Sequence, residues 1–274
     1  IGLYDLHSQI NAWMKSLNNW LLVLSVLSCI GCSSPVHEDG RGCAFVSDSI
    51  QYRVEFMSAG CVRILSFPEG DTLVTRRLVV DSEKPAFKDY KWEDTRQKLL
   101  FRTRELSVVF DKADVAFTFQ ETSTGKLLLK EKGDRKARNF KRSVAGGEQC
   151  LEVTQRFVPT EDEAIYGLGQ YQNGIMNYRG KSVLLLQANM DIVNPFLIST
   201  NGYGVLWDNY SSTKFEDTKE GYSFTSEVGD ASDYYFVYGK NMDEVVAGYR
   251  ELTGDVPMFG KWVYGFWQSK ERYK

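Results

Sequence analysis

The sequence predicts an all-β fold, a sandwich of antiparallel sheets. Apolar runs of about four residues recur roughly every ten residues between positions 44 and 240, separated by Gly, Asn and Pro. Such runs are too short for helices and fit strands. The pairs Asn173-Gly174 and Asn201-Gly202 favour tight hairpin turns, because Asn-Gly readily adopts positive φ. Short strands joined by tight turns at this spacing are typical of antiparallel sandwiches.

In the first part of the chain, the clearest strand signal is alternation. Tyr52, Val54 and Phe56 alternate with polar residues, which is the pattern of a strand buried on one face. Turn-forming residues at 111–114 and 122–125 separate later apolar runs into a meander. Further strands are predicted at 61–67, 106–110, 115–119, 126–130 and 151–157.

The stretch from Glu163 to Tyr210 is rich in glycine, amides and aromatic residues. Its apolar runs at 183–186, 195–198 and 205–207 predict strands. Amides beside flat aromatic faces fit sugars, which present hydroxyls at their edges and C–H groups on their faces. The same composition also fits a sandwich whose turns happen to use Asn and Gly. The amide and aromatic candidates are Gln170, Tyr171, Gln172, Asn173, Asn177, Tyr178, Gln187, Asn189, Asn194, Trp207, Asn209 and Tyr210.

One helix is predicted after a strand at 234–238. Asn241 is the expected N-cap, Glu244 follows three residues later, and Gly254 lies past the end. Gly248 inside the helix costs about 1 kcal/mol relative to alanine. The apolar segment 261–268 then predicts one more strand.

Charge and histidine content narrow the possible chemistry. The chain has 33 Lys and Arg against 36 Asp and Glu, so no nucleic acid or anionic membrane surface is expected as a partner. The basic run at 130–142 is interpreted as a solvated loop. His7 and His37 lie outside the predicted folded region, which excludes Ser-His-Asp or Cys-His nucleophiles and histidine-based metal sites. Carboxylates remain plentiful and fit glycoside hydrolysis, and no cofactor or metal is expected.

Residues 14–32 resemble a bacterial lipoprotein leader. Lys15 supplies the positive region, and the apolar run at 20–31 is too short to span about 30 Å of hydrocarbon. Cys32 follows Gly31 and precedes a polar tether, so Cys32 is the preferred lipidated residue and Cys29 the second candidate. An ordinary cleaved signal is the alternative. We therefore expect export and a lipid anchor at a bacterial membrane, periplasmic or at the cell surface.

The order of several motifs carries a family resemblance. YGLGQ at 166–170, NYRG at 177–180, QANMDIVNPFLIST at 187–200 and GYGVLWDN at 202–209 follow one another at workable spacing. This order resembles the N-terminal domain of glycoside hydrolase family 31, the α-glucosidase and α-xylosidase family. The segment GKWVYGFWQSKERY at 260–273 is similar to the entry into that family's catalytic barrel.

The resemblance implies a galactose-mutarotase-like supersandwich, a linker helix and the first strand of a (β/α)₈ barrel cut short at the chain end. A whole barrel needs roughly 250 residues. The family hydrolyses by retaining double displacement with two carboxylates about 5–5.5 Å apart. Both are expected beyond Lys274, so the rest of the barrel is expected in the same polypeptide. The implied domains are an upstream extension and leader at 1–32, a tether at 33–43, the sandwich at 44–240, the linker helix at 241–257 and the barrel start at 258–274.

The resemblance also assigns residues near the sugar. Asn189 and Asp191 match a loop that reaches over the barrel mouth, and Tyr273 matches an aromatic wall of the −1 sugar. The tail at 268–272 is similar to bacterial α-xylosidase-like members, so the oligosaccharide substrate is expected to end in α-xylosyl or α-glucosyl units. A turn role is the alternative for Asp191. For the whole chain, the alternative is a non-catalytic carbohydrate-binding β-sandwich lipoprotein.

Overall fold

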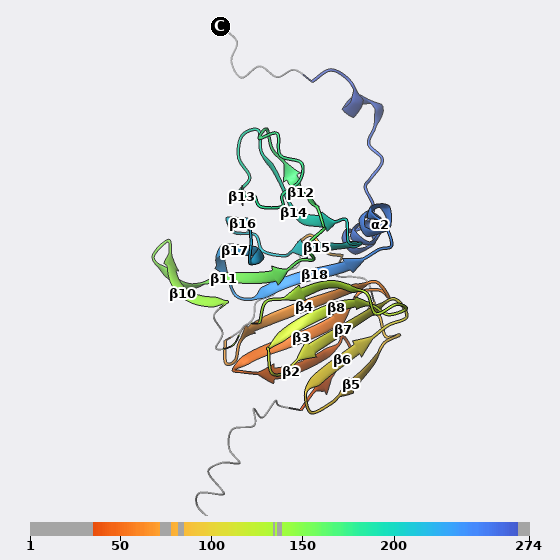
Figure 1. The fold of residues 1–274 in the computed structure, drawn as a ribbon. Helices are drawn as coiled ribbons and strands as arrows, with labels where there is room; N and C mark the ends of the chain where they lie inside the picture. The colour runs from red at the N-terminus through yellow and green to blue at the C-terminus, as the bar shows by residue number, and fades with distance from the viewer. Residues whose placement is uncertain (1–34, 72–77, 82–84, 134, 136–138, 268–274) are drawn as a thin grey trace, which may run out of the picture.

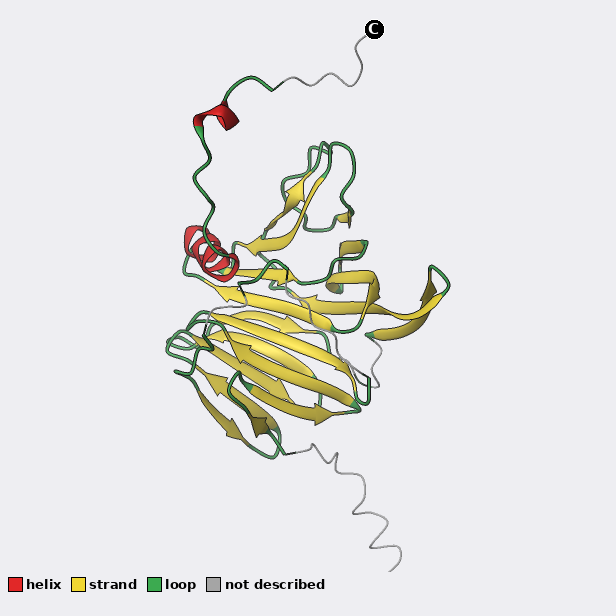
Figure 2. Ribbon diagram, turned by 180° about the vertical axis from the view of Figure 1, so that it is seen from behind, coloured by secondary structure: helices red, strands yellow, loops and turns green. Residues whose placement is uncertain are grey.

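Two antiparallel sheets stack face to face in the computed structural model, which describes residues 35–71, 78–81, 85–133, 135 and 139–267 (Figures 1 and 2). The eight-stranded sheet runs in the order β1 (His37–Glu38), β2 (Cys43–Ser47), β3 (Ile50–Phe56), β4 (Cys61–Pro68), β18 (Ser232–Tyr238), β15 (Tyr203–Trp207), β14 (Ile192–Ser199) and β12 (Ile165–Gln170). The ten-stranded sheet runs β13 (Ser182–Leu185), β16 (Thr213–Thr218), β17 (Gly221–Gly229), β11 (Glu148–Val158), β9 (Leu127–Glu131), β8 (Ala116–Glu121), β7 (Leu106–Asp111), β6 (Lys98–Arg102) and β5 (Lys91–Asp94), with β10 (Phe140–Ala145) paired to β11.

The core fills the space between the two sheets. Alternate residues of each strand point inward, as Leu106, Val108 and Phe110 do on β7, and all three are fully buried. Phe119 of β8 stacks on Phe236 of β18 with ring centroids 4.2 Å apart, so the two sheets meet through aromatic side chains. The predicted all-β sandwich is therefore confirmed.

Most of the predicted strands are present, with longer bounds. The alternating segment around Tyr52 is β3. The predicted runs at 195–198 and 205–207 lie in β14 and β15, and the run at 183–186 overlaps β13, which ends at Leu185. The β7–β8 turn extends one residue further than predicted, because Val115 has a φ of 54° and β8 begins at Ala116. The sequence pattern predicted no strand at the positions of β1, β2, β5, β6, β10, β12, β16 or β17.

The predicted helix is confirmed as α2 (Met242–Thr253). Asn241 Oδ1 accepts a hydrogen bond from Glu244 N at 2.9 Å and caps the start of the helix, and Glu244 Oε2 accepts one from the N–H of Lys240, the residue before the cap, at 2.9 Å. Val245 and Leu252 pack on the outer face of the eight-stranded sheet. A Cβ at Gly248 would lie 2.6 Å from Val237 Cγ1 of β18. Close packing on the sheet therefore explains the glycine within the helix.

The prediction of a strand at 261–268 is wrong for the described residues. Lys261–Tyr264 form the 3₁₀ turn η1, and the aromatic side chains Trp262 and Phe266 are exposed. A strand needs a neighbouring strand to take its backbone hydrogen bonds. No strand of the described part pairs with this segment, so its backbone bonds stay local, from Val263 N to Gly260 O and from Gly265 N to Trp262 O.

Folded structure also begins earlier than expected. Residues 33–43 were expected as a tether outside the fold, yet His37 and Glu38 form β1 against β2. Glu38 accepts hydrogen bonds from Tyr90 OH at 3.0 Å and Trp92 Nε1 at 3.1 Å. These contacts across 50 residues and more of sequence cannot be read from a short polar segment. No helix among the described residues has the length and apolar character needed to cross a membrane.

Candidate functional site

A lobe formed by residues 166–193 projects from the sandwich and carries most of β12, all of β13 and the start of β14 (Figure 1). Glycines of the YGLGQ motif shape its base. Gly167 and Gly169 have φ of 100° and 120° on either side of a register shift between β12 and β14. A Cβ would lie 2.5 Å from Phe196 O at Gly167 and 2.0 Å from Ile192 O at Gly169. Both positions therefore require glycine.

A tight turn at the edge of the lobe holds two of the predicted site residues. Ala188 and Asp191 form an isolated antiparallel bridge, with Met190 at a φ of 69° between them. Gln187 secures the turn, because its Nε2 donates to Asp191 O at 2.8 Å and its Oε1 accepts from Val193 N at 3.2 Å. Asn189 is exposed and Asp191 is half-buried.

The Asp191 carboxylate is not used by the turn. Its backbone N–H donates to Ala188 O at 3.3 Å, but its side chain makes no hydrogen bond or ion pair among the described residues. Its negative charge is felt by Tyr171, whose pKa is raised to about 12, first by burial and then by the charges of Tyr178 and Asp191. A half-exposed carboxylate whose oxygens make no hydrogen bond to the described residues is a strong acceptor for ligand hydroxyls.

Beside this turn lies a pocket of about 350 Å³. Its walls combine apolar side chains with hydroxyls, amides and one carboxylate. Tyr210 is one of the lining residues, and its hydroxyl accepts a hydrogen bond from Leu78 N at 2.8 Å. Burial raises the pKa of Tyr210 to about 12. The lining residues are Val79, Leu185, Leu186, Gln187, Val193, Pro195, Leu206, Trp207, Asp208, Asn209, Tyr210, Ser211, Ser212 and Thr213.

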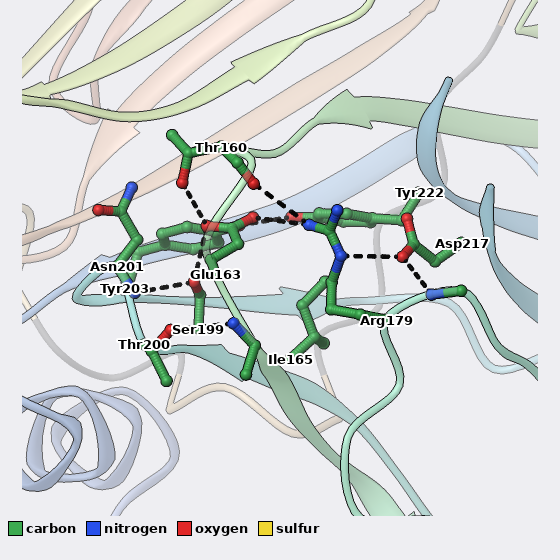
Figure 3. Close-up of polar contacts among 12 residues, drawn as sticks. Thr160, Glu163, Ile165, Arg179, Ser199, Thr200, Asn201, Tyr203, Asp217 and Tyr222 are labelled. Carbon is green, nitrogen blue, oxygen red and sulfur yellow. Dashed lines mark hydrogen bonds and ion pairs between the residues drawn. The ribbon is translucent and has the colours of Figure 1, made fainter. Parts of the chain in front are cut away.

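A buried charged network lies at the base of the lobe (Figure 3). Glu163 accepts hydrogen bonds from Ser199 Oγ at 2.8 Å and Tyr203 OH at 2.9 Å. The Arg179 guanidinium lies 3.6 Å from Glu163 Oε1 and 3.0 Å from Asp217 Oδ2. Sequence reasoning placed Arg179 only within the NYRG motif and did not identify Glu163 or Asp217, because their partners come from separate strands.

Burial governs the electrostatics of this network. Desolvation raises the pKa of Glu163, while the hydroxyls of Ser199 and Tyr203 and the charge of Arg179 act in the opposite direction. Burial also raises the pKa of Tyr203 well above the ordinary tyrosine value. The tyrosine hydroxyls therefore stay protonated and act as donors to the carboxylate. The two carboxylates of this network are therefore held within the fold and are not presented to solvent.

Several of the residues that the sequence suggested for sugar binding have structural roles instead. Tyr178 and Trp207, grouped with the sugar-facing aromatics, are buried in the core, which corrects that interpretation. The Asn177 and Asn209 side chains hold loops: Asn177 Oδ1 accepts from Ile165 N at 3.1 Å, and Asn209 Nδ2 donates to Val228 O at 3.0 Å. Cys29, Cys32 and Tyr273 lie outside the described residues. In the described part of the chain, no three His, Cys, Asp or Glu residues cluster as metal ligands.

Comparison with known proteins points to a single family. A family model described as the glycosyl hydrolase 31 N-terminal galactose mutarotase-like domain matches residues 51–216. An α-xylosidase of Saccharolobus solfataricus is 36% identical over 241 residues, covering 82% of this chain and 31% of that protein. α-Glucosidase 2 of Bacillus thermoamyloliquefaciens is 26% identical, covering 84% of this chain and 30% of that protein. The chain thus spans about a third of the length of these curated relatives.

Solved structures show the same fold. A crystal structure of a family 31 α-xylosidase from Xanthomonas citri superposes with a TM-score of 0.75 at 23% identity, covering 87% of this chain and 42% of that chain. An α-xylosidase from a soil metagenome, solved with xylose, gives a TM-score of 0.73 at 24% identity, covering 88% and 37%. At these identities, the likeness concerns the fold.

Proposed function

Because the chain belongs to glycoside hydrolase family 31, we propose that it is the N-terminal part of a retaining α-glycosidase that cleaves α-xylosyl or α-glucosyl ends of oligosaccharides. The relatives named as α-xylosidases support the xylosyl form. Two carboxylates would perform the chemistry in a portion of the relatives' length that this chain does not span. One attacks the anomeric carbon while the other protonates the departing oxygen and then activates water.

The role proposed for the lobe is to shape the mouth of the active site. The observation that carries it is the turn at 188–191, where the Asp191 carboxylate has no hydrogen-bond partner among the described residues although Gln187 fixes its backbone. A positioned acceptor of this kind binds two sugar hydroxyls without rearranging. Asn189 adds an exposed amide that both donates and accepts. Tyr273 is proposed as the aromatic wall of the same sugar.

We propose the barrel of the same polypeptide as the partner of the exposed apolar segment after α2. Large apolar side chains are rarely exposed together unless another surface covers them. Here they follow one another along a segment with little secondary structure, beside the projecting lobe (Figure 1). The exposed residues are Val256, Met258, Phe259, Trp262, Tyr264, Phe266 and Trp267.

Hydrolysis by the full-length protein tests the proposed function. We expect release of nitrophenol from an aryl α-xyloside or α-glucoside and no turnover of the β-anomers. Proton NMR during hydrolysis should show the α-anomer of the free sugar first, because double displacement retains configuration. Early β-anomer would contradict the retaining mechanism. Sugar binding without turnover would favour the non-catalytic carbohydrate-binding alternative.

We further propose that the mature protein is exported and lipid-anchored through Cys32. The support is the apolar run that ends at Gly31 and the polar residues that follow Cys32. Mass spectrometry of the native N-terminus should find Cys32 first, with an acyl mass attached. A mature N-terminus elsewhere without acyl mass would remove the anchor, and acyl mass on Cys29 would move it.

A further inference from the structure

The turn that carries Asp191 connects a strand of one sheet to a strand of the other. The chain reaches it from β13, which pairs with β16 in the ten-stranded sheet. It leaves through β14, which pairs with β12 and β15 in the eight-stranded sheet. Residues 186–191 are all that separate β13 from β14. The position of the turn therefore depends on how the two sheets are held relative to each other at this end of the sandwich.

Arg179 joins the two sheets at the base of the lobe. On one side its NH1 donates to Thr160 O at 3.5 Å and lies 3.6 Å from Glu163 Oε1, both on the chain that leads into β12. On the other side its Nε contacts Asp217 Oδ2 of β16 at 3.0 Å. Gly180 N also donates to Asp217 Oδ2, at 2.6 Å. One guanidinium thus connects the segment that leads into β12, the edge strand of the eight-stranded sheet, to β16, which lies next to the edge strand β13 in the ten-stranded sheet (Figure 3).

The burial of the partners makes this connection strong. The Glu163 and Asp217 side chains are each 1% exposed, so water screens their attraction to Arg179 weakly. Glu163 is anchored in turn by Ser199 and Tyr203 of the eight-stranded sheet. A planar guanidinium can reach two carboxylates at once through separate N–H groups, whereas a lysine ammonium acts as a single point charge.

We propose that Arg179 is a positioning residue that fixes the two sheets at the base of the lobe and thereby sets the position of Asp191. The last step of this inference, from Asp191 to sugar, rests on the proposed function. The first step, from Arg179 to the order of the turn, does not depend on any substrate.

The test compares substitutions of two similar arginines in the full-length protein. Arg179→Met removes the guanidinium and keeps an unbranched apolar stem. Arg53→Met is the matched control, because Arg53 also contacts two carboxylates, Asp39 and Glu55, and is 24% exposed against 26% for Arg179. Arg53 lies on β3, at a distance from the lobe in the sheet order. Arg179→Lys is the conservative variant.

Two readouts are expected to separate the variants. Hydrogen exchange of the peptide spanning 186–193 should quicken about tenfold in Arg179→Met and stay unchanged in Arg53→Met. For hydrolysis, kcat/KM should fall roughly tenfold in Arg179→Met, less than the hundredfold that a displacement of about 1 Å can cost. Arg179→Lys should lie between the wild type and Arg179→Met. Arg179→Met should lose more Tm than Arg53→Met, because both of its partner carboxylates are 1% exposed whereas Asp39 is 35% exposed.

Unchanged exchange at 186–193 in Arg179→Met would overturn the proposal. So would equal losses of kcat/KM in the two Met variants, since that pattern reports general destabilisation. Faster exchange at 186–193 in a protein that hydrolyses no α-glycoside would keep the positioning role and reject the proposed function. The two failures are therefore distinguishable.

Discussion

Replacing Asp191 by alanine in the full-length protein should lower kcat/KM roughly ten- to a hundredfold and leave Tm nearly unchanged. Charge-assisted hydrogen bonds from sugar hydroxyls to a desolvated carboxylate contribute about 1.5–3 kcal/mol. At about 1.36 kcal/mol per decade, this gives the expected range. Stability should be retained, because the side chain makes no hydrogen bond or ion pair within the described structure and the turn is held by Gln187.

Kinetics and thermal unfolding measured on the same Asp191→Ala sample check this expectation. Asp191→Asn keeps the shape and one acceptor oxygen, so its loss of kcat/KM should be smaller. Glu93→Ala serves as the control, because Glu93 is an exposed carboxylate on β5, the opposite edge strand of the ten-stranded sheet from β13. A lowered Tm with normal kcat/KM would assign Asp191 to the turn, and unchanged values of both would remove it from the site.

Replacing Trp207 by alanine should cost about 3–5 kcal/mol of the free energy of unfolding. Trp207 is fully buried on β15 and its ring stacks on Phe224 of β17 with centroids 5.7 Å apart. Its Nε1 donates to Ser226 Oγ at 2.9 Å. The side chain therefore links the two sheets, and its removal leaves a cavity between them and ends that hydrogen bond.

Denaturant unfolding followed by circular dichroism measures this loss. Trp207→Phe is the matched variant, because a phenyl ring keeps part of the stacking and gives up the N–H donor. We expect Trp207→Phe to lose less than half as much as Trp207→Ala. Near-native stability of Trp207→Ala with weakened sugar affinity would instead restore Trp207 as a sugar-facing aromatic.

The local sequence pattern was sufficient to predict those strands and the helix whose signals lie within a few residues of one another. Alternation around Tyr52 predicted β3, and the capping residues Asn241 and Glu244 predicted α2. The glycines of YGLGQ and the order of the later motifs indicated the family, which the match over residues 51–216 confirmed. These features are encoded locally, because strand alternation and helix caps depend on near neighbours.

The exposure of individual side chains could not be predicted from local sequence in this way. Trp207 and Asn189 both come from a stretch rich in amides and aromatics, yet one is fully buried and the other is exposed. The segment at 261–268 has the apolar character of a strand but no strand beside it in the described structure. Whether a side chain is buried or exposed depends on which strands pack beside it, and those strands come from distant parts of the sequence.

By itself, the sequence determined an all-β sandwich with one capped helix, its family, and a carboxylate at Asp191 in a loop. Only the tertiary structure decided that the Asp191 carboxylate makes no hydrogen bond to the described residues and that Arg179 joins Glu163 to Asp217 across the two sheets. It also decided that β18 lies between β4 and β15, although about 170 residues separate Arg63 from its partner Tyr235. Strand propensity is local, but strand pairing and charge burial arise between segments far apart in the chain, so they exist only once the sheets are assembled.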